Sequence, residues 1–171
     1  MVLINNAGYL GNVKYLGDLD NEDFVHPFHV NLTAAAILSN AFIRKYGSHP
    51  IKKIILNISS GASRKAYDGW SGYCSSKAGL DLFSRVMALE NEKRGGNLRV
   101  VSLAPGIIDT EMQKQVRNVS SRDFSSVDRF HAMKENNQLL SPVQAARQII
   151  RFLEELDRYP GIMQDIRDLN P

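Results

Sequence analysis

Cysteine is almost absent from this sequence, because Cys74 is the only one among its 171 residues. A single thiol forms neither an internal disulfide nor a cysteine metal cluster, which agrees with a reducing compartment. No apolar run approaches the roughly 20 residues that a membrane span needs. The opening MVLINNAGYLGN also lacks the charged start and long apolar stretch of a secretory signal. We therefore expect a cytoplasmic protein without a membrane partner.

Histidine and clustered positive charge are also scarce. His26 and His29 are three residues apart but have no acidic or cysteine partner at a telling distance, so we expect an exposed helix face and no metal. The net charge is +3 and the sequence pI about 9.0. The basic residues are scattered, and Lys52 and Lys53 are the only adjacent lysines. This pattern argues against a nucleic-acid partner, while a phosphate-bearing cofactor would fit the positive charge.

Strand and helix patterns alternate along the chain, which is 43% hydrophobic and 23% charged and has the size of one domain, residues 1–171. Strands are expected at 1–5, 51–60, 98–106 and 161–169, and helices at 21–46, 71–94 and 141–157. Residues 111–140 are polar and mixed, which suggests a helical lid. Such alternation predicts an α/β fold with a parallel sheet, whose ligands bind beyond the carboxyl ends of the strands.

Polar and glycine-containing turns follow the first three expected strands. Asn5, Asn6 and Gly8 follow the first strand, Ser59 and Ser60 end the second, and 105–110 follow the third. Each turn taken alone is ordinary loop chemistry. Their joint position at strand ends predicts one crevice, which the start of helix 71–94 would also reach.

Tyr73 and Lys77 are four residues apart at the start of that helix. Residues at this spacing share a helix face, with Cβ atoms about 5–6 Å apart. A neighbouring ammonium favours the ionised phenol, so the pair could transfer a proton near neutral pH. The alternative is a tyrosine packed under a lysine stem, which is the commoner reason for such a pair.

Four motifs in order resemble the short-chain dehydrogenase/reductase family: NNAG at 5–8, NISS at 57–60, YCSSK at 73–77 and PGIIDT at 105–110. The resemblance runs from residue 1 to about 168 and implies a Rossmann-like, doubly wound parallel sheet. The family's Thr-Gly-x-x-x-Gly-x-Gly turn is absent. By this resemblance the chain is the carboxyl-terminal portion of the fold, truncated at its N-terminal side and beginning at the fourth strand. Roughly 70–80 residues would then be missing, at about 30 per strand–helix unit.

The resemblance implies hydride transfer between a nicotinamide and a carbonyl compound. It makes Tyr73 the general acid, with a pKa lowered by Lys77 and the oxidised cofactor. Lys77 would also hold the ribose, and Ser60 would hydrogen-bond the substrate carbonyl. Asn31 would position a proton-relaying water, although a buried residue satisfied at a helix kink is the alternative. The implied NADP(H) contacts are Asn6, Ala7, Gly8, Asn31, Tyr73, Lys77, Pro105, Gly106, Ile107 and Thr110.

Within the family, the segments SSGASRKAYDGWSGYCSSKAGLDLF and APGIIDTEMQ resemble the branch of benzil and sepiapterin reductases. This implies reduction of a 1,2-dicarbonyl such as benzil to the hydroxyketone with NADPH, with Ser60 also contacting the substrate. Tyr67, Trp70 and Met112 would supply apolar walls, although Trp70 could instead anchor a loop or a dimer contact. For a sepiapterin-type substrate, Asp165 would hold the pterin ring.

Two further expectations concern the chain as a whole. The first is a homodimer through the two long helices, 21–46 and 71–94, when the protein is complete. The second is that the 171 residues alone bind NADPH weakly and lack activity, because the pyrophosphate-binding turn is missing. The competing hypothesis is a non-catalytic remnant that acts as an assembly partner.

Overall fold

Four parallel strands form the centre of the computed structural model, in which residues 1–169 are described. They are β1 (Val2–Asn5), β2 (Lys53–Ile58), β3 (Leu98–Ala104) and β4 (Met163–Asp165), and they lie side by side in that order. The expected parallel sheet is therefore confirmed. The last strand is shorter than expected, because the Asp165 carboxylate accepts a hydrogen bond from the backbone N–H of Arg167 and starts a 3-10 turn, Ile166–Asp168.

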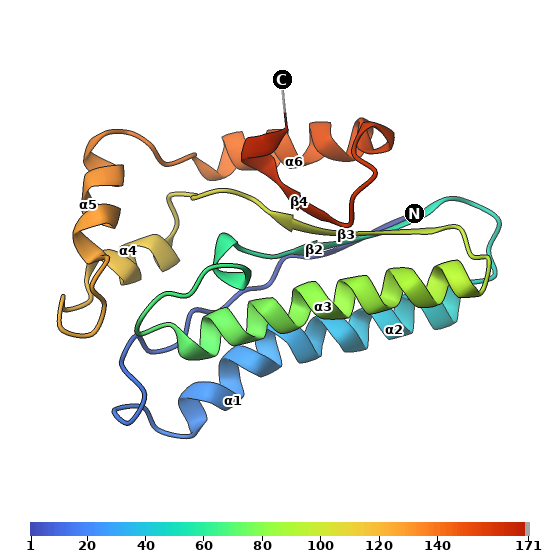
Figure 1. Ribbon diagram of the computed structural model, residues 1–171. Helices are drawn as coiled ribbons and strands as arrows, with labels where there is room; N and C mark the ends of the chain where they lie inside the picture. Colours follow the sequence, from blue (N-terminus) through green and yellow to red (C-terminus); the bar gives the residue numbers. More distant parts are fainter. Residues whose placement is uncertain (170–171) are drawn as a thin grey trace.

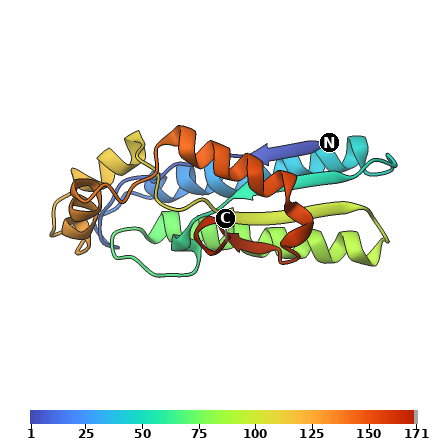
Figure 2. The ribbon, with the colours of Figure 1, turned by 90° about the horizontal axis from the view of Figure 1, so that it is seen from above.

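Helices cover both faces of this sheet, as Figures 1 and 2 show. One face carries α1 (Glu22–Phe28), α2 (Ala34–Tyr46) and α3 (Ser71–Lys93), and the other carries α6 (Pro142–Glu154). The lid expected at 111–140 consists of two short helices, α4 (Glu111–Arg117) and α5 (Val127–Glu135). The arrangement is Rossmann-like and doubly wound, as the sequence indicated.

The first long helix contains an irregular turn. Residues His29–Thr33 form a π-helical turn between α1 and α2. Pro27 lies just before it, inside α1, and lacks a backbone N–H for the helical ladder. Wider turns of this kind often occur at functional sites. Here the turn contains Asn31, whose side chain is almost completely buried.

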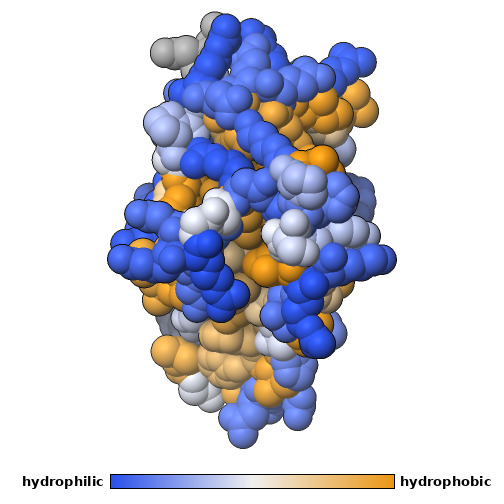
Figure 3. Space-filling view, turned by 90° about the vertical axis from the view of Figure 1, so that its right-hand side faces the viewer, coloured by the Kyte–Doolittle hydropathy of each residue, from blue (hydrophilic) through white to orange (hydrophobic). Residues whose placement is uncertain are grey.

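The two faces of the sheet have separate apolar cores. Neighbouring residues of a strand point to opposite faces, so Ile55 packs with Met87 on the α2 and α3 side, while Leu56 packs with Phe152 on the α6 side. Seen from the end where the strands begin, hydrophilic side chains cover much of the surface, with apolar patches between them (Figure 3). Within residues 1–169, no helix has the length and apolar character of a membrane span.

Candidate active site

The carboxyl ends of β1, β2 and β3 meet at one edge of the sheet, to the right of α4 and α5 in Figure 1. The register aligns them, because Asn5 pairs with Asn57 and Asn57 pairs with Ser102. The segments that leave these strands, and the first turn of α3, therefore emerge together. The groups predicted to converge from the separate motifs are thus brought to one edge of the sheet, and we call this region the crevice.

Tyr73 and Ser60 are neighbours in this crevice. Tyr73 lies in the first turn of α3 and is 8% exposed. Ser60 follows β2, and its Oγ accepts a hydrogen bond of 3.1 Å from the backbone N–H of Ala62, which fixes the oxygen and leaves the hydroxyl proton to donate. Burial raises the pKa of Tyr73, and the adjacent Ser60 hydroxyl acts in the opposite direction.

Lys77 lies one turn further along α3 and is 2% exposed. Its Nζ donates a hydrogen bond of 2.8 Å to the backbone carbonyl of Ile58 and lies 5.9 Å from the centroid of the Tyr73 ring. Burial lowers the pKa of Lys77 to about 8, although the negative charge of Asp81 opposes that shift. An ammonium has three donors, so two remain after the bond to Ile58.

The Tyr73 pKa shows no lowering by Lys77 in the protein without cofactor, while the expected effect of the oxidised cofactor stays a prediction. The pKa is raised, because loss of solvent around a buried phenol disfavours its charged form. The ammonium of Lys77 lies 5.9 Å from the ring and has a lowered pKa of its own. The protein by itself therefore keeps Tyr73 protonated at neutral pH, which is the form that can donate a proton.

Asn31 is held by hydrogen bonds within the protein. Its Oδ1 accepts from the backbone N–H of Tyr9 over 2.8 Å, and its Nδ2 donates to the carbonyl of Tyr9 and to Ser76 Oγ, each over 2.9 Å. The side chain thus joins the loop after β1 to α3. The structure shows a buried asparagine satisfied at an irregular helical turn, while its role in holding a water stays a prediction.

The loop after β1 forms one wall of the crevice. Asn6, Ala7 and Gly8 are exposed there. A Cβ atom at Gly8 would lie 3.6 Å from Lys77 Nζ and 3.9 Å from Met112 Cε. Glycine at this position therefore leaves open the space between the ammonium and the lid.

The loop after β3 forms the opposite wall. Pro105, Gly106 and Ile107 are partly buried, and Thr110 is exposed and precedes α4 without capping it through its side chain. Its hydroxyl is therefore not used to begin that helix. Met112, in the first turn of α4, packs against the buried aromatic cluster and extends toward Gly8.

Trp70 is part of a buried aromatic cluster. The ring is 7% exposed and stacks on Phe124 with centroids 5.0 Å apart and planes at 17°. Tyr67 is partly buried and contacts Trp70 at 4.9 Å. Gly69, between them, has a φ of +71°, and a Cβ there would lie 2.2 Å from the carbonyl oxygen of Asp123. Trp70 therefore packs against the lid segment, as an anchor would, while its role as a substrate wall stays a prediction. Tyr67 is the more accessible ring.

Asp165 is also buried near this edge, but its carboxylate is already bound. Arg167 Nε donates to Oδ1 over 2.8 Å, and Nη2 donates to Oδ2 over 2.6 Å. The Arg167 side chain accordingly lowers the pKa of Asp165. A pterin ring could reach this carboxylate only in competition with Arg167.

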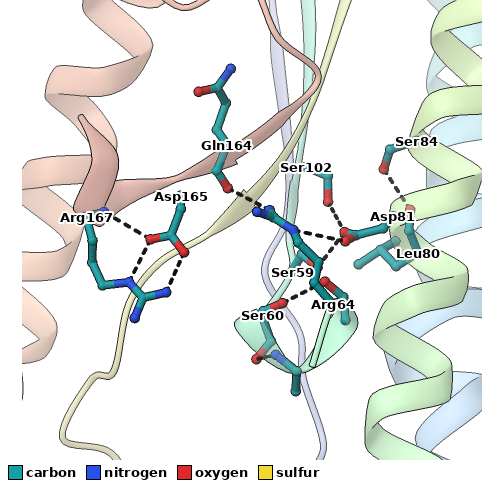
Figure 4. A network of polar contacts seen from close by, with 12 residues as sticks. Ser59, Ser60, Arg64, Leu80, Asp81, Ser84, Ser102, Gln164, Asp165 and Arg167 are labelled. Atoms are coloured by element: carbon teal, nitrogen blue, oxygen red, sulfur yellow. Dashed lines mark hydrogen bonds and ion pairs between the residues drawn. The ribbon is translucent and has the colours of Figure 1, made fainter. Parts of the chain in front are cut away.

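The sequence reasoning missed a polar network around Ser60, shown in Figure 4. Asp81 Oδ1 accepts hydrogen bonds of 2.6 Å from both Ser59 Oγ and Ser102 Oγ. Arg64 Nε lies 3.9 Å from the other oxygen of Asp81. One signal was available, because Asp81 is four residues after Lys77 and so lies on the same face of the helix.

Two curated proteins are similar to this chain over most of its length. Over 155 residues the chain is 39% identical to benzil reductase ((S)-benzoin forming) from Bacillus subtilis (strain 168), covering 91% of this chain and 64% of the relative. It is 30% identical over 171 residues to sepiapterin reductase from Meriones unguiculatus, covering 98% and 63%. The chain thus spans less than two thirds of the length of these curated relatives.

A solved structure and a family model also match this chain. A mutant of 4-hydroxyisoleucine dehydrogenase, complexed with NADH and succinate, superposes with a TM-score of 0.76 at 27% identity, over 96% of this chain and 66% of that one. Residues 1–120 match the family model described as short chain dehydrogenase. The chain therefore belongs to the short-chain dehydrogenase family of oxidoreductases.

Proposed function

We propose that the complete protein containing this chain is a carbonyl reductase that uses NADPH. The observation that carries the proposal is the group at the strand ends: a protonated Tyr73 next to Ser60, with the buried ammonium of Lys77 one helical turn away. These groups supply a proton donor, a hydrogen-bond donor and a positive charge at one place. The names of the relatives, benzil reductase and sepiapterin reductase, support the same class of reaction.

The residues of the crevice fit a nicotinamide cofactor. Lys77 Nζ lies 3.6 Å from where a Cβ atom of the exposed Gly8 would be, and ribose hydroxyls would accept its two remaining ammonium protons. Thr110, at the facing loop, has a hydroxyl that is not used for capping. When bound, the cofactor supplies the hydride. The solved relative complexed with NADH supports a nicotinamide, and our choice of NADPH over NADH rests on the reductase branch.

The chain's own residues then handle the substrate oxygen. Ser60 donates its hydroxyl proton in a hydrogen bond to the substrate carbonyl, and this bond strengthens as negative charge develops on that oxygen. Tyr73 transfers its phenolic proton to the same oxygen. Lys77, fixed by the Ile58 carbonyl, keeps its ammonium 5.9 Å from the centroid of the Tyr73 ring while the proton is transferred.

We propose a 1,2-dicarbonyl such as benzil as the substrate class, reduced to the hydroxyketone. The greater identity to benzil reductase, 39% against 30%, supports this choice over sepiapterin. So does Asp165, because Arg167 occupies both of its oxygens. Tyr67 and Met112 offer apolar surface beside the catalytic group. The cytoplasmic location that we also propose rests on the lone, unpaired Cys74.

The test follows consumption of NADPH and of NADH by the purified complete protein with benzil, sepiapterin and simple monoketones. We expect turnover of benzil with NADPH to exceed the rest. Turnover of monoketones alone would refute the substrate class, and no turnover with any carbonyl would favour the non-catalytic alternative.

We also propose that the complete protein is a homodimer through α2 and α3. These helices lie side by side (Figure 1), and their outer faces expose Ile37, Leu38, Leu82, Val86 and Leu89. Covering such a row with a second copy would remove it from water. Light scattering should report a dimer for the parent protein and a monomer for Leu82→Glu/Leu89→Glu. A monomeric parent protein would contradict the proposal.

A further inference from the structure

Two arginine–aspartate pairs lie beside the Ser60 turn and have no role in the chemistry described above (Figure 4). Arg64 faces Asp81, and Arg167 binds Asp165. The carboxylate side chains are only 10% and 7% exposed, whereas the arginine side chains are 43% and 59% exposed. Each acid is therefore enclosed, and each guanidinium is left at the surface of the crevice.

Arg167 lies between the two loops that flank the substrate carbonyl. A Cβ atom at Gly106 would be 3.9 Å from Arg167 Cγ, and a Cβ atom at Gly61 would be 3.8 Å from Arg167 Nη2. The stem therefore starts at the loop after β3, and the guanidinium ends beside the turn that begins with Ser60. Arg64 also reaches β4, where its Nη2 donates to the carbonyl of Gln164 over 3.2 Å.

The Arg167 guanidinium has donors to spare. A guanidinium has five N–H groups, and Asp165 accepts from one on Nε and one on Nη2. Three N–H groups remain, fixed in direction because the bidentate pair sets the plane of the fork. Asp165 thus holds the Arg167 guanidinium in place. The group that can bind a ligand is the guanidinium, which donates hydrogen bonds.

We propose that Arg167 binds an oxygen next to the carbonyl held by Ser60 and Tyr73, and so selects substrates with a ketone or carboxylate group on the adjacent carbon. The inference rests on the proposed reductase function. A monoketone would leave these directed donors without an acceptor, and sites built to hydrogen-bond a group discriminate strongly against ligands that lack it.

The test compares three substrates in the complete protein: benzil, phenylglyoxylate and deoxybenzoin, a monoketone with the same two phenyl rings as benzil. In Arg167→Met we expect kcat/KM for the first two to fall about 10–100-fold and for deoxybenzoin less than about 3-fold. Arg167→Lys keeps the charge but loses the fork, so it should rescue phenylglyoxylate more than benzil. Arg158→Met is the control, because it removes an arginine whose side chain is 71% exposed. The ratios of kcat/KM among the three substrates should not change in this variant.

Arg167→Met leaves the Asp165 carboxylate without its partner, so Asp165→Asn/Arg167→Met is measured as well. An equal loss on all three substrates in both variants would overturn the inference and give Arg167 a structural role. A fall in kcat/KM for benzil alone would show that Arg167 binds a ketone oxygen, and a fall for phenylglyoxylate alone would show that it binds a carboxylate. If the parent protein reduces none of them, the reductase proposal fails separately. In that case thermal stabilisation by phenylglyoxylate tests the role of Arg167. The stabilisation should occur in the parent protein and be lost in Arg167→Met, and its absence from the parent protein would overturn the inference.

Discussion

The ammonium of Lys77 donates a hydrogen bond of 2.8 Å to the backbone carbonyl of Ile58, the last residue of β2. This bond ties α3 to the sheet at the point where Ser60 and Tyr73 meet. The same burial that orients the ammonium also lowers its pKa to about 8.

Stability should therefore depend on pH through Lys77. The folded pKa is about 8 and the ordinary value 10.5, so between these values the unfolded chain binds the proton more strongly and stability rises with pH. Below about pH 8 both states are protonated and the contribution is constant. We expect the free energy of unfolding of the parent protein, relative to Lys77→Met, to rise by at most about 3 kcal/mol from pH 8 to 10.5 in urea titrations.

Burial also raises the pKa values of Tyr73 and Cys74, and a raised pKa of this kind lowers stability as pH increases. Both remain in Lys77→Met, so the difference between the two proteins isolates Lys77. Lys93→Met, at the exposed end of α3, is the matched control and should follow the parent protein. Parallel curves for the parent protein and Lys77→Met would contradict the assigned shift.

Tyr73→Phe in the complete protein should reduce kcat by about 10²–10⁴-fold, because it removes the transferable proton and leaves the ring in place. Dissociation constants for NADPH, measured by calorimetry, should change little. Tyr46→Phe is the control, since Tyr46 ends α2 and packs on Phe42, away from the crevice. Retention of most activity in Tyr73→Phe would make Tyr73 a packing residue.

Asp81→Ala should destabilise the protein by about 2–5 kcal/mol, because the buried hydroxyls of Ser59 and Ser102 would lose their acceptor. Asp81→Asn keeps an oxygen acceptor and should cost less. Glu92→Ala, an exposed acid on the same helix, is the control. Urea denaturation measures all three, and an equal effect of Asp81→Ala and Glu92→Ala would rule out a structural role for the network.

Trp70→Ala should loosen the lid, because the stack on Phe124 would be lost from a buried cluster. Removing a buried tryptophan typically costs about 3–5 kcal/mol. We expect faster limited proteolysis within 111–135, while Trp70→Phe should keep much of the protection. Unchanged cleavage with a raised KM for benzil would instead make Trp70 a wall of the substrate pocket.

Regular elements could be predicted from the sequence because their signals are local. Apolar runs between glycine and proline stops indicated buried strands, and helical periodicity indicated the segments between them. The resemblance of four motifs to one family indicated how the strands and helices are arranged. A kink at Asn31 was one of two interpretations, but its π-helical form at His29–Thr33 could not be predicted, since a single extra residue within a helix leaves no periodic signal.

The sequence by itself determined the parallel sheet, the meeting of its polar turns at the carboxyl edge, and the placing of Tyr73 and Lys77 on one helix face. Only the tertiary structure decided what surrounds these groups. Trp70 is buried because Phe124 and Phe130 arrive from the lid, Lys77 has its lowered pKa because β2 and α3 exclude water around it, and Asp165 is neutralised by Arg167. Spacing along the chain reveals which residues share a face, but burial and charge pairing depend on segments far apart in sequence, such as Arg64 and Gln164, which are 100 residues apart.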